Sequence, residues 1–148
     1  METRRDGVSE KLDELSSSLV GAALDLLADG HDIDVRLVVE DADGNVASYV
    51  FSDDGPEEVL LAARERVSEL AASHGDRGEG LGDPIRYALT YEGMVADDEG
   101  AYRDALILEF GERGWNAYSA FSLYEGKGAK DAFAWTDPAP AGEIEPLL

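Results

Sequence analysis

The stretch Asp41-Ala42-Asp43-Gly44-Asn45 has the oxygen-bearing side chains and the glycine of a calcium-binding loop. If Gly44 is aligned with the invariant glycine of an EF-hand, the first and last ligand positions fall on Val39 and Val50, which carry no side-chain oxygen. An Asp-Gly pair between two β-rich segments is instead typical of a type I′ hairpin turn. We therefore expect a turn and no calcium site.

Two glycine-rich segments imitate phosphate-binding loops. Residues 78–82 follow a predicted helix and precede a predicted strand, the reverse of a dinucleotide fingerprint, and Glu79 stands where a phosphate would approach. Residues 126–130 lack the first glycine of a P-loop, because Phe121 stands there, and lack its hydroxyl residue. We expect a flexible linker and a solvated turn. Anion binding by backbone N–H groups and lysines at 126–130 is an alternative.

The residue types needed for catalysis are sparse. The two histidines, His31 and His74, lie at predicted helix ends, and a metal site with Asp32 or Asp34 would need a ligand spacing that the sequence does not provide. The chain has no cysteine and no Gly-x-Ser-x-Gly elbow. Its carboxylates are too numerous for any pair to be singled out. The sequence thus indicates no catalytic residue, metal ligand or cofactor, and it favours a protein that is not an enzyme.

The chain carries 33 acidic and 12 basic residues, for a formal net charge of -21. This charge argues against binding to nucleic acid or to anionic membrane surfaces. Only three of the basic residues are lysines, which suits a salt-rich, halophilic cytoplasm, although the coding bias of a GC-rich genome would give the same composition. The most apolar stretch, residues 19–28, is too short to span a bilayer, and a cytoplasmic location is expected.

Hydrophobic spacing predicts two helices and five strands. Apolar residues recur at intervals of three and four over residues 9–29, with Ser9 as the N-cap, and again after a helix start at residues 52–58, as far as about residue 74. Alternating patterns predict strands over residues 33–40, 46–51, 85–91, 102–110 and 115–124. A proline-rich, irregular tail follows from about residue 125. The whole chain, residues 1–148, is expected to form one domain.

The element order is α-β-β-α-β-β-β, and we predict an α+β fold with both helices on one face of a mainly antiparallel five-stranded sheet. This order resembles the roadblock and profilin-like α/β folds. The size, acidity and mixed layout resemble secretion chaperones that bind effector proteins. No diagnostic motif of either group is present, and a roadblock domain would end in a helix where this chain has its proline-rich tail. The sequence is assigned to neither.

If the helices cover one face, the other face of the sheet is open. Arginine and tyrosine are enriched among interface anchors. The residues predicted to form a binding surface on the open face are Arg36, Arg86, Arg103, Tyr118 and Tyr124. A solvated face with weak Arg–Glu pairs between strands is the alternative. The double substitution Arg86→Glu with Tyr118→Ala is expected to dissociate a dimer without unfolding the chain.

The function that the sequence favours is a non-catalytic protein-interaction or dimerisation module, whose partner is another protein or a second copy. One alternative is an acidic inhibitor or chaperone-like protein that binds a basic partner. Another is a small enzyme with an unrecognised carboxylate site. Salt separates the first two, because a charge-driven complex weakens steeply as salt rises and a packed apolar contact does not.

Overall fold

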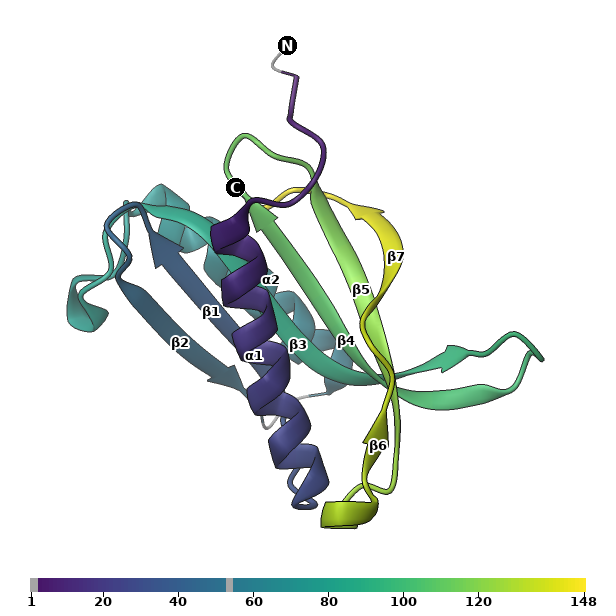
Figure 1. Ribbon diagram of the computed structural model, residues 1–148. Coiled ribbons are helices and arrows are strands. Elements are labelled where there is room, and N and C mark those ends of the chain that lie inside the picture. Colours follow the sequence, from purple (N-terminus) through teal and green to yellow (C-terminus); the bar gives the residue numbers. More distant parts are fainter. Residues whose placement is uncertain (1–2, 53–54) are drawn as a thin grey trace.

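The computed structural model describes residues 3–52 and 55–148 (Figure 1). Short 3-10 turns lie at Arg77–Glu79 and Lys130–Ala132. The helices and strands are α1 (Glu10–Ala28), β1 (Val35–Asp41), β2 (Val46–Phe51), α2 (Pro56–Ala72), β3 (Pro84–Ala96), β4 (Tyr102–Glu112), β5 (Ala117–Glu125), β6 (Ala134–Trp135) and β7 (Ala139–Ile144). The α+β class with two helices is therefore confirmed, whereas the observed element order differs from the predicted α-β-β-α-β-β-β by the two strands that follow β5.

The strands form one sheet in the order β2-β1-β3-β4-β5-β6, and β7 also pairs with β5. Each of these pairings is antiparallel, as predicted. The predicted number of five strands is wrong, because the tail expected to be irregular includes β6 and β7. Neither has the alternation of a half-buried strand, and β7 contains Pro140, which an edge strand tolerates because one side of its backbone needs no hydrogen bond.

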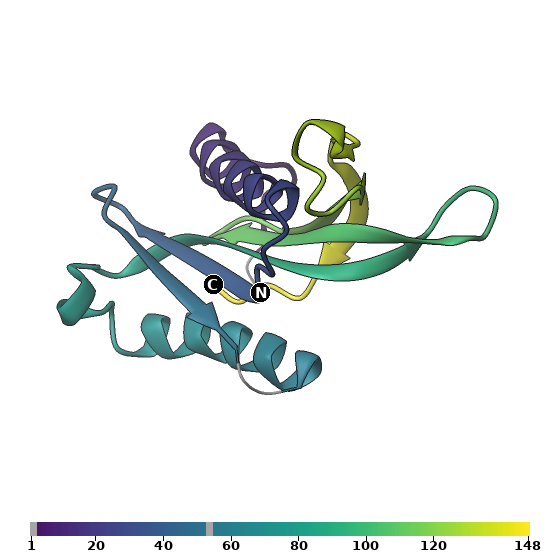
Figure 2. The same ribbon diagram turned by 90° about the horizontal axis from the view of Figure 1, so that it is seen from below.

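The two helices lie on opposite faces of the sheet, as Figure 2 shows, so the prediction that both cover one face is wrong. On one face, Leu24 and Leu27 of α1 share a core cluster with Leu106. On the other, Val67 of α2 belongs to a separate cluster that includes Leu37 of β1. The sheet is thus the middle one of three layers, with a hydrophobic core on each side.

The prediction that only one face of the sheet is buried fails in β3. Tyr87 and Leu89 lie in the α2 cluster, but Ala88 and Thr90 are buried as well, beneath α1. The side chains at these alternate positions are small and let the α1 backbone approach the sheet closely. The pairing of Thr90 with Leu108 then places the apolar residues of β4 on the α1 side.

Most local features of the first half agree with the sequence. The hydroxyl of Ser9 accepts a hydrogen bond from the Leu12 N–H at 3.1 Å and caps α1. The β1–β2 connection is a tight turn, as expected, but Gly44, at φ +86°, is the only residue of 41–45 with a positive φ, so the predicted type I′, which needs two, is wrong. The carboxylate of Asp41 accepts hydrogen bonds from the N–H groups of Asp43, Asn45 and Gly82, and so ties this turn to the loop before β3.

The hairpin of β3 and β4 extends beyond the rest of the sheet (Figure 1). Its outer part carries two exposed apolar side chains, Met94 and Tyr102. The turn is closed by the carboxylate of Asp97, which accepts hydrogen bonds from the backbone of Glu99 and Ala101. Within the described residues, no helix is both long enough and apolar enough to cross a membrane.

Candidate functional site

The five residues predicted to form one binding surface do not share one open face. Arg36, Arg86, Tyr118 and Tyr124 lie on the face that α1 covers, because they pair with residues of that face in β1, β3, β4 and β5. Arg103 follows the alternation of β4 onto the opposite face. The predicted open face therefore does not exist, and the environments of the five residues differ from one another.

Arg86 is a buried structural residue, only 6% exposed. Its Nε donates to Glu112 at 2.8 Å, its Nη1 donates to Glu40, and the hydroxyl of Ser9 also donates to Glu112 at 2.7 Å. Burial lowers the pKa of this guanidinium, and the two carboxylates raise it by more, so it stays charged. This cluster joins β1, β3 and β4 to the start of α1 and is closed to a partner.

The two tyrosines anchor the terminal segments. Tyr124 is 5% exposed, donates to Glu92 at 2.8 Å and stacks on Phe133 at 5.7 Å between ring centroids. Burial and the Glu92 carboxylate raise the pKa of Tyr124 above its ordinary value of 10.0. Tyr118 is half-buried, and its hydroxyl accepts a hydrogen bond from the Gly7 N–H at 2.8 Å. Both side chains therefore hold the fold together.

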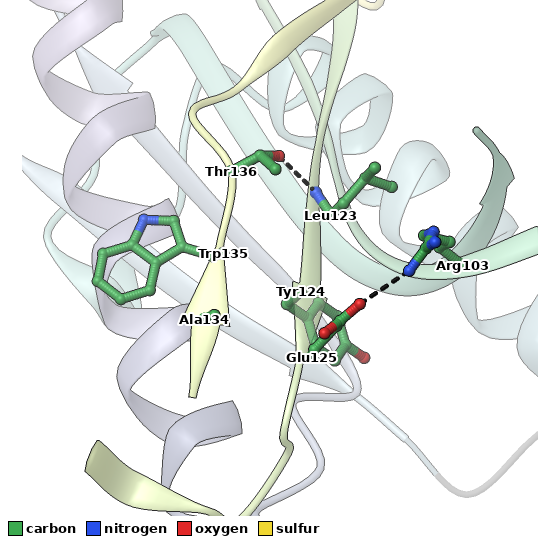
Figure 3. A pocket seen from close by; sticks show the side chains of 7 residues that line it. All are labelled: Arg103, Leu123, Tyr124, Glu125, Ala134, Trp135 and Thr136. Atoms are coloured by element: carbon green, nitrogen blue, oxygen red, sulfur yellow. Dashed lines mark hydrogen bonds and ion pairs between the residues drawn. The ribbon is translucent and has the colours of Figure 1, made fainter. Parts of the chain in front are cut away.

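Arg103 and Tyr124 line a surface pocket of about 280 Å³ beside β6 (Figure 3). The guanidinium of Arg103 pairs with Asp97 at 2.7 Å and with Glu125 at 2.8 Å, and the Arg103 side chain is exposed to water. The ring of Trp135 lies on the other side of the β6 ribbon. Because the one cation of this pocket is already paired with two carboxylates, its lining offers no free positive charge to a ligand.

Arg36 lies in a second depression, a groove of about 380 Å³ between α1 and the outer strands β1 and β2. The helix packs mainly on β3 and β4 and leaves this part of the sheet uncovered. The side chains that line the groove are mostly apolar or small: Leu15, Ser18, Leu19, Ala22, Arg36, Val38, Val46, Ser48 and Val50. An uncovered part of the α1 face therefore lies above β1 and β2, and Arg36 borders it.

Strand β2 is an outer edge of the sheet, and among the described residues no further strand pairs with the backbone groups on its outer side. The N–H of Asp41 donates to the Asn45 carbonyl, and hydrogen-bonded pairs alternate along an antiparallel ladder. The N–H and C=O groups of Ala47, Tyr49 and Phe51 therefore face β1. Those of Val46, Ser48 and Val50 point outward from the sheet.

This edge lacks the features that usually protect an edge strand. Residues 46–51 contain no lysine, no proline and no charged residue at all, in a chain where 30% of residues are charged. Val46 is 46% exposed and Val50 is 52% exposed, and both border the groove. Sequence analysis identified the strand but not its place at the edge, because that place follows only from the order of the strands.

Of the buried carboxylates of the described residues, Glu109 and Glu112 are engaged in ion pairs, whereas Asp41 accepts hydrogen bonds from neutral N–H groups. Glu109, on the α2 face, accepts hydrogen bonds from Arg64 at 2.9 Å and from the Tyr91 hydroxyl at 2.9 Å. Glu112 is held by Arg86. Across residues 3–52 and 55–148, no group of three or more histidine or carboxylate side chains is placed to hold a metal ion. The ion pairs of Glu109 and Glu112 join neighbouring elements and balance charge inside the fold.

Comparisons of this chain with protein-family models, with curated proteins and with solved structures gave no match.

Proposed function

We propose that this protein is a non-catalytic interaction module that binds a partner strand along the open edge of β2. The observation that carries this proposal is the combination of an uncharged edge strand with the apolar groove beside it. Addition of a strand to a sheet edge is a common mode of recognition, in which main-chain hydrogen bonds supply affinity and alternate side chains supply specificity.

The groove indicates which face of an added strand should carry apolar side chains. Val46, Ser48 and Val50 line it on one side and Leu15 and Ala22 of α1 on the other. Apolar side chains of a bound strand that point to this face would be removed from water against these residues. Each buried CH₂ group contributes about 0.8 kcal/mol.

A peptide tests this function without knowledge of the natural partner. A synthetic peptide with the sequence of residues 45–52, flanked by lysines for solubility, is titrated in molar KCl onto protein kept dilute enough to be a monomer, so that its β2 edge is free. A peptide with the same residues in permuted order and the same lysines is the control. We expect hydrogen exchange at the Val46, Ser48 and Val50 amides to slow with the first peptide only. Equal protection by both peptides, or by neither, would contradict the proposal.

A second candidate function, binding of a basic partner by charge, is supported by the net charge of -21. Such a complex should lose affinity steeply with rising salt, whereas a strand docked on β2 should not. Retention of a partner in molar KCl therefore favours the edge, and its release favours the charge.

A further inference from the structure

We infer that the partner strand at the β2 edge is the β2 strand of a second copy of this chain, paired antiparallel about a two-fold axis at Ser48. This inference rests on the proposed function, because it names the occupant of the same edge. It goes further by specifying the register and the symmetry of the complex.

The residues of β2 are self-complementary in that register. With Ser48 opposite its own copy, Val46 lies opposite the partner's Val50, and Tyr49 lies opposite the partner's Ala47. Valine thus meets valine on the groove face, and a large side chain meets a small one on the other face. A two-fold interface needs such self-complementarity, because each residue pair occurs twice.

The backbone groups agree with the same register. Val46, Ser48 and Val50 are the residues whose N–H and C=O groups point outward, and this register places each of them opposite another member of that set. Each such pair can exchange two hydrogen bonds, as hydrogen-bonded pairs of an antiparallel ladder do. A register shifted by one residue would place outward groups opposite inward ones and lose the ladder.

Charge favours a second copy over a basic partner at this site. Residues 46–51 provide no carboxylate that could pair with a lysine or arginine, so a neutral strand fits them better. A second β2 strand is such a partner. Since each chain carries a net charge of -21, the two copies repel each other at long range, and salt should strengthen the dimer by screening.

Sedimentation equilibrium in molar KCl measures the mass of the assembly directly. We expect twice the chain mass of 15.9 kDa, with a larger dissociation constant at low salt. Val50→Lys and Ser48→Pro should each give a monomer, and the proline removes only an outward N–H, so the β1–β2 ladder is kept. Leu61→Lys, at a 54% exposed position on α2, should leave the dimer intact. A wild-type monomer at the highest attainable concentration overturns the inference.

The absence of native cysteine allows a second test, of the register itself. Opposed Cα atoms in a hydrogen-bonded pair are about 5.5 Å apart, within the range of a disulfide. Ser48→Cys should therefore cross-link into a covalent dimer under mild oxidation, while Ser68→Cys, exposed on α2, should not at the same concentration. Equal cross-linking of the two variants overturns the register.

The outcomes separate this inference from the function on which it rests. If the chain is a monomer but the peptide of residues 45–52 protects the β2 amides, the edge binds a strand and the occupant is another protein. If the chain is a monomer and the peptide gives no protection, the proposed function fails too. A dimer that survives both Val50→Lys and Ser48→Pro places the interface elsewhere and overturns the inference.

Discussion

At the scale of single residues, several arginines of this chain form ion pairs with its own carboxylates. Arg64 neutralises Glu109, which is 3% exposed, and Arg86 neutralises Glu112. The first pair joins α2 to β4, and the second joins β3 to β4. In these two pairs the arginine allows a carboxylate to be buried, because an unpaired buried charge is strongly unfavourable.

Removing the guanidinium of Arg86 should therefore destabilise the fold. We expect Arg86→Met to lower the free energy of unfolding by about 3–5 kcal/mol, since Glu40 and Glu112 would face each other without a cation. Urea unfolding followed by circular dichroism measures this. Arg103→Ala is the control and should have a much smaller effect, because its ion pairs face water. Equal losses in the two variants would contradict this account.

The same geometry changes the expected result of Arg86→Glu with Tyr118→Ala. The sequence places both side chains on an open face, where their replacement would leave the fold intact. Since Arg86 is buried between two carboxylates, a third carboxylate at this position should unfold the chain. The double variant therefore cannot report on a dimer interface, and Val50→Lys replaces it for that purpose.

Asp41 should make stability depend on pH. Burial raises the pKa of its carboxyl, but hydrogen bonds from Gly82, Asn45 and Asp43 outweigh this and hold the pKa below the ordinary value of 3.8. The contribution of Asp41 is thus fully present above pH 3.8 and is lost as the pH falls through the lowered pKa. We expect the difference in unfolding free energy between wild type and Asp41→Asn to shrink in acid. A difference that stays constant from pH 7 to pH 3 would contradict this.

At the scale of elements, the sequence predicts the helices and central strands well. The apolar spacing in α1 and α2, the Ser9 cap and the Asp43-Gly44 turn are local signals, and local hydrogen bonding and burial decide them. The helix faces depend instead on which side of β3 each helix crosses. Since both sides of β3 are buried, alternation alone could not assign them.

The candidate site was predicted only in part, for the same reason. Arg36 does border the groove, but the edge of β2 is defined by β3 lying between β1 and β4, which is a long-range choice. The sequence shows that residues 46–51 carry no charge, but it does not show that this strand lies at the edge of the sheet. Sequence analysis missed β6 and β7, which both pair with the outer edge of β5. Their side chains do not alternate between buried and exposed, so their sequences lack the pattern by which strands are predicted.

The end of α2 offers a test of element geometry. Gly75 has φ +120°, and a Cβ there would lie 2.3 Å from the carbonyl oxygen of Leu81, a backbone atom that cannot easily move. We expect Gly75→Ala to lower the free energy of unfolding by about 1–3 kcal/mol, through backbone strain and this contact. Gly78→Ala is the matched control in the same loop, because a Cβ there meets only Asp76 at 3.4 Å. Similar unfolding curves for both variants would contradict the assignment of strain to Gly75.

At the scale of the whole molecule, the net charge of -21 dominates, because self-repulsion favours the expanded chain over the compact one. We expect the melting temperature to rise with KCl. The Debye length falls from about 30 Å at 0.01 M salt to about 8 Å at 0.15 M, so much of the gain should come in this range. For a chain of this size, a gain of about 1 kcal/mol corresponds to a rise of about 2–4 °C.

Dimerisation would also raise the melting temperature with salt, so the two effects must be separated. Binding between copies makes the midpoint depend on protein concentration, whereas relief of repulsion within one chain does not. Melts of Val50→Lys at several concentrations isolate the second effect, because this variant is expected to be monomeric. If its midpoint is unchanged or lower in molar KCl, self-repulsion is not what limits stability, and a salt-rich cytoplasm loses its support as the origin of the acidic composition. A rise that is independent of concentration assigns the salt dependence to the fold itself.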